Sequence, residues 1–306
     1  MNRRDCLASG LALLAAAKPA WASEPLPDDE ASDEPPSKEP FSLFVATPER
    51  AVIRMLELAR VTSNDLVLDL GSGDGRIPIV AARRYGARGR GVDINPRLVE
   101  QSVAEARRQD VAGRVRFETG DVMDTDVSAA TVVTMYLFPA LIARLKPKLW
   151  SQLKPGARIV VYDYSMTEWP AEEALTLYVP ERYLGRGGDV TARLWVRPAD
   201  FSGRWFGMME AGSGLPLELS IDQRYQRIQG TGRMGGANVD LYNAHVQGPT
   251  IEFLVEDAAR TRYEIVARLE GNSMRGEARI QGGTENSTAA WMARRVASGL
   301  PIDRPV

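Results

Sequence analysis

Residues 69–75 read Asp-Leu-Gly-Ser-Gly-Asp-Gly, directly after a short apolar run over Leu66–Leu68. A helical pattern begins at Arg76. A strand that turns through glycines into a helix is typical of nucleotide sites in open α/β sheets, because glycine lets the backbone turn tightly and lets a ligand approach closely. This stretch therefore predicts an α/β fold with a ligand at the carboxyl end of the strand.

The acids of the turn narrow the class of ligand. Asp69 and Asp74 would repel a pyrophosphate but favour a cation. The dinucleotide fingerprint also has a third glycine where Arg76 stands in this chain. S-adenosylmethionine carries an ammonium and a sulfonium and no phosphate, so we expect it as the cofactor. The expected contacts at the turn are Asp69, Gly71, Ser72, Gly73 and Asp74.

Two further acids follow the next two expected strands. Asp93 lies at the end of the strand pattern 88–94. Its distance in sequence from the glycine turn, about twenty residues, is that of an acid that accepts from the ribose hydroxyls of a nucleoside. Asp121 follows the strand pattern 114–117 and is placed to accept from an adenine amino group, while Val122 covers the ring. Either acid alone is more often a cap or a turn residue. Three acids at the ends of three successive strands favour an adenosine site.

The same motifs resemble the class I S-adenosylmethionine-dependent methyltransferases. Within that class the chain is similar to the protein-lysine methyltransferase family that includes the adenine nucleotide translocase and ATP synthase lysine methyltransferases. The matching segments are 46–59, which begins Ala-Thr-Pro, then 69–77, 91–93, 120–121 and 153–156. The resemblance covers residues 41–198. It implies a Rossmann-like, seven-stranded mixed sheet and N-methylation of a protein lysine.

The acceptor side of such a site is expected after the fourth strand pattern, 131–136. Tyr136 and Phe138 offer aromatic walls for a methylated ammonium through cation–π contact, and Tyr136 is our candidate catalytic residue. The alternative is that these rings pack the sheet against the next helix, which we favour for Phe138. Asp163 and Tyr164, at the end of the fifth strand pattern, are weaker candidates. Thr47 either closes over the cofactor or caps the helix that Pro48 begins.

Composition is that of a globular enzyme. The chain has 306 residues, of which 44% are hydrophobic and 25% charged, and its net charge is −2. A nucleic-acid partner is not expected, because a domain that binds nucleic acid is usually basic. The single cysteine, Cys6, and the single histidine, His245, exclude a disulfide, a Cys/His zinc site and Ser-His-Asp hydrolysis in the mature chain. We expect His245 to be a structural residue on a strand, and no metal site.

The first 40 residues have the pattern of an export signal and a linker. Residues 1–23 contain Arg3-Arg4, a modest apolar stretch and a small-residue cleavage site at 20–22, which resembles a twin-arginine signal. The apolar stretch is too short to span a bilayer stably. Residues 24–40 hold seven acids, one lysine and several prolines, which predicts a disordered acidic linker. We therefore expect export to the periplasm, where supply of the cofactor is in question.

Residues 199–306 read as a second, β-rich domain. Before it, the patterns 175–183 and 190–196 predict an antiparallel pair that completes the first sheet. Short alternating runs then recur at 215–221, 225–231, 239–245, 251–256, 263–269 and 274–280, separated by glycine-rich turns, as in an antiparallel barrel or sandwich. Gly-Arg-Trp at 203–205, with Trp291 and Arg294, weakly resembles the lipocalin arrangement. Aromatic packing into the core is the favoured alternative.

Together these patterns favour an exported methyltransferase that acts on a protein lysine. A small-molecule acceptor, selected with the help of the β-rich domain, stays open. A third possibility is a binding protein that holds the cofactor without turnover. The sequence does not identify the acceptor.

Overall fold

The computed structural model describes residues 44–209, 215–282 and 285–299. The expected export signal, residues 1–23, and the expected acidic linker, residues 24–40, lie outside these residues. Among the helices that the structure describes, none has the length and apolar character needed to cross a membrane.

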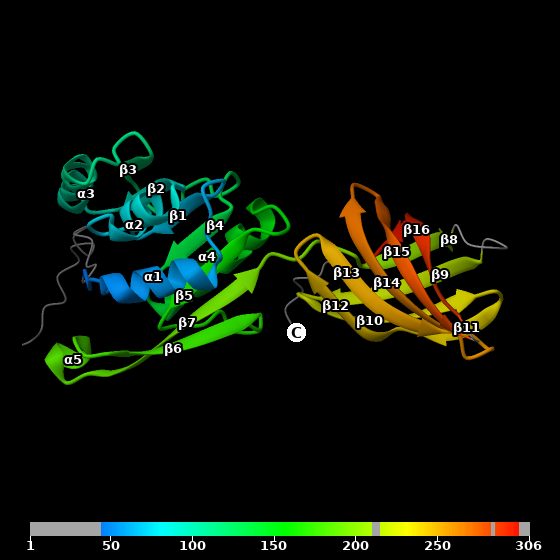
Figure 1. Ribbon diagram of the computed structural model, residues 1–306. Coiled ribbons are helices and arrows are strands. Elements are labelled where there is room, and N and C mark those ends of the chain that lie inside the picture. Colours follow the sequence, from blue (N-terminus) through cyan, green and yellow to red (C-terminus); the bar gives the residue numbers. More distant parts are fainter. Residues whose placement is uncertain (1–43, 210–214, 283–284, 300–306) are drawn as a thin grey trace, which may run out of the picture. The chain divides into compact units, whose positions relative to one another are not determined.

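A seven-stranded mixed sheet forms the first part of the described chain, with the order β3-β2-β1-β4-β5-β7-β6 (Figure 1). The parallel strands are β1 (Leu66–Leu70), β2 (Arg88–Asp93), β3 (Val115–Thr119), β4 (Val132–Met135) and β5 (Arg158–Tyr162). The antiparallel strands are β6 (Glu173–Val179) and β7 (Gly188–Val196). Because β2 and β4 flank β1, the strand order reverses there, which is where open α/β sheets bind ligands. The expected sheet is confirmed.

Helices cover both faces of this sheet. They are α1 (Glu49–Leu58), α2 (Arg76–Tyr85), α3 (Pro96–Arg108) and α4 (Pro139–Gln152). Buried residues of α1 and α2 pack with Val67 and Val132, whereas α4 packs with Leu68 and Val133. Successive side chains of a strand point to opposite faces, so a fully apolar strand supplies both cores. The two cores hold the strand ends, and hence the ligand edge, in place.

The second part of the chain is an antiparallel β-barrel rather than a sandwich (Figure 1). Its strands are β8 (Gly203–Met209), β9 (Pro216–Arg224), β10 (Arg227–Met234), β12 (Tyr242–Gln247), β13 (Thr250–Glu256), β14 (Arg262–Glu270), β15 (Ser273–Gly282) and β16 (Glu285–Ser298). Pairing of β9 with β10 closes the sheet, and short β11 (Ala237–Asp240) pairs with β10 as well. Alternate residues point inward, and Trp205, Phe253 and Trp291 are among the most buried.

Three expectations about strands were wrong in detail. The strand expected at 175–183 ends at Val179, and Arg182–Gly185 forms a short helix, α5. The run 239–245 is split at Leu241 into β11 and β12, which places His245 on an exposed position of β12. The pattern missed β16 as a strand, because several of its inward positions are alanine, a residue with low strand propensity.

Arg295 ties the last barrel strand to the segment that enters the first. Its guanidinium carbon lies 4.4 Å from the centroid of the Trp205 ring, and Nη1 donates to the Ser202 carbonyl at 2.6 Å. Nη2 donates to the Asp200 carbonyl, and the side chain is only 10% exposed. Arg294, the arginine singled out from the sequence, is exposed instead. The ring contact therefore belongs to its neighbour, and both tryptophans pack into the core.

We expect Arg295→Ala to lower the free energy of unfolding of the barrel by about 3 kcal/mol, because a cation–π contact and charged hydrogen bonds to carbonyls are lost together. Arg294→Ala is the matched control on the same strand, with an expected change within about 0.5 kcal/mol. Urea unfolding followed by tryptophan fluorescence measures both. Equal losses in the two variants would contradict the role given to Arg295.

Candidate active site

The glycine turn between β1 and α2 needs glycine for its backbone and for space. Gly71, Gly73 and Gly75 have φ angles of 77°, 54° and 76°, in the left-handed region. A Cβ on Gly71 would lie 2.6 Å from Cδ2 of Leu137. Side chains at these positions would therefore both strain the turn and collide with neighbouring side chains.

Asp93 fastens the turn to the end of β2. Its Oδ2 accepts from the Gly73 amide at 2.8 Å and its Oδ1 accepts from the Asn95 amide at 2.9 Å. The residue is only 6% exposed. Each carboxylate oxygen can accept more than one hydrogen bond, so both keep capacity for the hydroxyls of a ribose.

Asp69, at the carboxyl end of β1, is a buried acid bonded to a hydroxyl. Thr134 of β4 donates from Oγ1 to its Oδ1 at 2.7 Å. Burial raises the pKa of Asp69 to about 7; the Thr134 hydrogen bond opposes this, and the charges of Asp93 and Asp74 add to it. A cationic group beside Asp69 would favour the ionised carboxylate, so this position suits an ammonium.

Asp74 has a different environment from Asp69. Its Oδ1 accepts from Arg76 Nε at 2.8 Å, and its Oδ2 accepts from Arg76 Nη2. Arg76 also donates from Nη1 to the carbonyl of Thr47 at 2.6 Å, which holds the segment before α1 near the turn. Thr47 itself is 4% exposed. The carboxylate that the sequence assigned to the cofactor is thus engaged by arginine.

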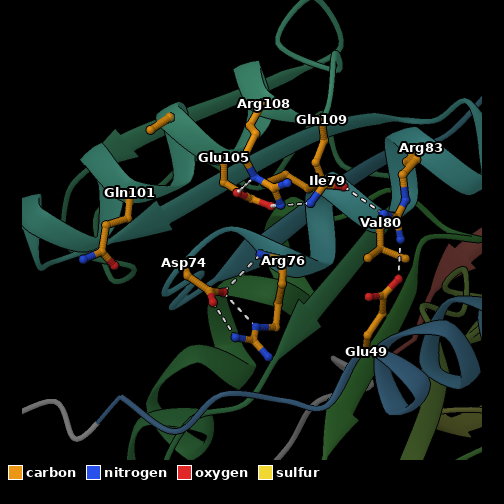
Figure 2. Close-up of a pocket in the computed structure, with 11 residues that line it drawn as sticks. Glu49, Asp74, Arg76, Ile79, Val80, Arg83, Gln101, Glu105, Arg108 and Gln109 are labelled. Atoms are coloured by element: carbon orange, nitrogen blue, oxygen red, sulfur yellow. Dashed lines mark hydrogen bonds and ion pairs between the residues drawn. The ribbon is translucent and has the colours of Figure 1, made fainter.

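A pocket of about 540 Å³ lies beside Asp74, between α2 and α3. Figure 2 shows that its charged side chains meet in pairs: Asp74 with Arg76, Glu49 with Arg83, and Glu105 with Arg108. Its remaining lining comes from both helices, for example Ile79, Val80 and Gln101. Because these acids and arginines compensate one another, the pocket has no charge preference that would mark it as the cofactor site.

The remaining expected cofactor residues lie at the ends of β1 and β3. Ser72 is 4% exposed, and its Oγ has no hydrogen-bond partner among the described residues. Asp121 is exposed and accepts from the Met123 amide at 2.7 Å, while Val122 is buried against the core beneath. An acid for an ammonium, an acid for a ribose and a spare hydroxyl fit S-adenosylmethionine. The backbone cradle of glycines fits it too.

Three tyrosines meet at the ends of β4 and β5. Tyr136 contacts Tyr162 edge to face, with ring centroids 4.9 Å apart, and stacks on Tyr164 at 6.2 Å. Met135 of β4 pairs with Leu70 of β1. The next residues along the two strands are Tyr136 and Gly71, so Tyr136 follows β4 at the same edge of the sheet where the glycine turn follows β1. We call Tyr136, Tyr162 and Tyr164 the tyrosine cluster. It brings Tyr136 and Tyr164 together as the sequence suggested, and adds Tyr162.

Two other residues near this edge differ from expectation. Phe138 is 60% exposed, so the prediction that it packs the sheet is wrong. Asp163 is held by Arg182 of α5, a residue that the sequence analysis did not identify. No local motif connects positions 163 and 182, because the contact depends on how β6 and β7 fold back.

The model of the family described as "ANTKMT methyltransferase domain" matches residues 69–173. A protein-lysine N-methyltransferase of Saccharolobus islandicus is 41% identical over 137 residues, which are 44% of this chain and 85% of that protein. The adenine nucleotide translocase lysine N-methyltransferase of Mus musculus is 30% identical over 161 residues, which are 52% of this chain and 64% of the mouse protein.

Among solved structures, an RNA methyltransferase from Salinibacter ruber, crystallised with S-adenosyl-L-homocysteine, is 43% identical. The match covers 51% of this chain and 96% of that one, with a TM-score of 0.47. The archaeal relative is matched over most of its length, and the family model begins at the first acid of the glycine turn. The chain therefore belongs to the ANTKMT family of S-adenosylmethionine-dependent protein-lysine methyltransferases.

Proposed function

We propose that the exported chain transfers the methyl group of S-adenosylmethionine to a lysine of a protein. The observation that carries the proposal is the contrast along one sheet edge, with acids at the ends of β1 and β2 and tyrosines at the ends of β4 and β5. Acids suit the cationic cofactor, and aromatic faces suit an amine that becomes a methylated ammonium. The family of the archaeal relative supports lysine as the acceptor.

The reaction requires no covalent bond between the protein and the methyl group. The lone pair of a neutral lysine nitrogen attacks the methyl carbon, the carbon–sulfur bond breaks toward sulfur, and a proton leaves the nitrogen. Catalysis then rests on holding nucleophile and donor in line, and on an environment where the amine is neutral. We assign the cofactor ammonium to Asp69, the ribose to Asp93, the adenine to Asp121 and Val122, and the amine to Tyr136. Desolvation in an apolar setting lowers the pKa of a Lys amine.

Label transfer tests the reaction and the acceptor class together. Purified protein is incubated with methyl-labelled S-adenosylmethionine and a cell extract, and the labelled products are hydrolysed and identified. We expect methyl-lysine, and we expect Asp93→Ala to abolish both labelling and calorimetric binding of S-adenosylhomocysteine. Label found in RNA or in small metabolites would overturn the lysine assignment. Cofactor binding without any transfer would favour a binding protein.

The pKa of Asp69 gives the cofactor affinity a specific pH dependence. Because the cation favours the ionised carboxylate, protonation of Asp69 below a pKa of about 7 opposes binding. We expect the Kd for S-adenosylhomocysteine, measured by calorimetry, to be about tenfold higher at pH 6 than at pH 8. Asp69→Asn should bind more weakly at high pH and lose this dependence. A wild-type Kd that stays flat from pH 6 to 8 would exclude Asp69 as the partner of the ammonium.

We propose that residues 1–23 direct export through a twin-arginine route. Cleavage at the small-residue site, residues 20–22, would release a mature chain without the signal. In fractionated cells that produce the full chain, we expect this product in the periplasm. Replacing Arg3 and Arg4 by lysine should leave the full-length chain in the cytoplasm, whereas Lys38→Gln, outside the signal, should not. An uncleaved wild-type chain in the cytoplasm would refute export.

A further inference from the structure

Asp163, which stands between two tyrosines of the cluster in the chain, forms an ion pair with Arg182. Asp163 stands between Tyr162 and Tyr164, and its two carboxylate oxygens each accept from Arg182 at 2.9 Å, through Nη1 and Nη2. The side chains are 16% and 21% exposed, so the pair is screened from solvent. Fork-to-fork pairing of this kind fixes geometry as well as charge.

The backbone around Asp163 depends on this pair and on its neighbours. Asp163 has a φ of 71°, in the left-handed region, and its amide donates to the Thr191 carbonyl at 3.0 Å. Arg182 also donates to the carbonyl of Asp189 at 2.5 Å, and Arg193 donates to the carbonyl of Tyr164 at 3.2 Å. The ion pair therefore anchors the turn that brings the Tyr164 ring onto Tyr136.

We propose that Arg182 is a positioning residue for the acceptor, which keeps the tyrosine cluster electrically neutral by holding Asp163 in an ion pair. This inference rests on lysine methylation as the proposed function. A lysine attacks as the neutral amine, and its ordinary pKa is about 10.4. A carboxylate without its arginine beside the acceptor would stabilise the ammonium and hold back the reactive form, because opposite charges at short range raise the pKa of an amine.

Both charges of the ion pair affect the pKa of Tyr162, one member of the cluster. Burial raises the pKa of Tyr162 to about 12, Tyr136 and Asp163 add to the rise, and Arg182 and Arg50 oppose it. Arg193 of β7 also donates to the Tyr164 carbonyl. Asp189 of β7 and Glu181 before α5 are the further charged residues on the segments that contact Arg182 and Arg50. Glu181 is paired with Arg50.

The pH dependence of kcat, which reports ionisations in the enzyme–acceptor complex, separates this role from a merely structural one. Methyl transfer is measured from labelled S-adenosylmethionine to poly-L-lysine and to cell extract, counted as methyl-lysine. In Arg182→Gln, Asp163 lacks its arginine, so we expect the acidic limb of the profile to move up by about one pH unit. In Asp163→Asn the arginine charge remains, so the limb should move down. The double variant should return close to the wild-type position.

Arg60→Gln is the matched control, because it breaks an exposed ion pair with Glu173 elsewhere on the same sheet. Its profile should coincide with that of the wild type. The Kd for S-adenosylhomocysteine should stay within about twofold in every variant, which reports that the cofactor half of the site is folded. Profiles that coincide in all variants, or shifts of the same sign in both single variants, would overturn the inference. A wild-type protein that methylates no lysine would overturn the proposed function itself.

Discussion

The hydrogen bond from the Gly73 amide to Asp93 is the contact on which the site depends. It joins the turn after β1 to the end of β2, two segments that are adjacent in space but twenty residues apart in the chain. Three glycines in the left-handed region contribute no side chains of their own to hold the turn. A buried, charge-assisted hydrogen bond therefore defines its shape, and it does so with the same carboxylate that we assign to the ribose.

Asp74 and Asp69, two acids near the turn, lie in different electrostatic environments. Arg76 compensates Asp74 and ties it to the segment that precedes α1, so this acid supports structure on the helix side. Asp69 is buried against Thr134, with two other acids contributing to its raised pKa. A buried carboxylate that is costly to ionise alone is poised to accept a cation, since the ligand supplies the missing charge. Cofactor selectivity can thus arise from burial rather than from the number of acids.

Much of the first sheet and of the cofactor edge follows from the sequence, because the relevant signals are local. Glycines next to an apolar run, and acids after successive strands, predict Asp69, Gly73 and Asp93 at one edge. The ion pair between Asp74 and Arg76 was harder to predict from the sequence, since nearby opposite charges also occur on solvated helices. The contact between Asp163 and Arg182 depends on the course of β6 and β7, which no periodicity encodes. β16 was missed because alanines fill inward positions that larger residues usually mark.

The sheet separates two electrostatic requirements that would conflict in a single pocket. A sulfonium donor is favoured by nearby carboxylates, but the same carboxylates would keep a lysine amine protonated. Here Asp69 and Asp93 lie at the carboxyl ends of β1 and β2, whereas tyrosines lie at or just beyond the ends of β4 and β5, and Asp163 is paired with Arg182. β4 contributes to both regions. Thr134 donates its hydroxyl hydrogen bond to Asp69, and Tyr136 follows two residues later in the chain. Neighbouring parallel strands thus place a region suited to a cation beside a region suited to a neutral amine, which is the pairing that methyl transfer to nitrogen requires.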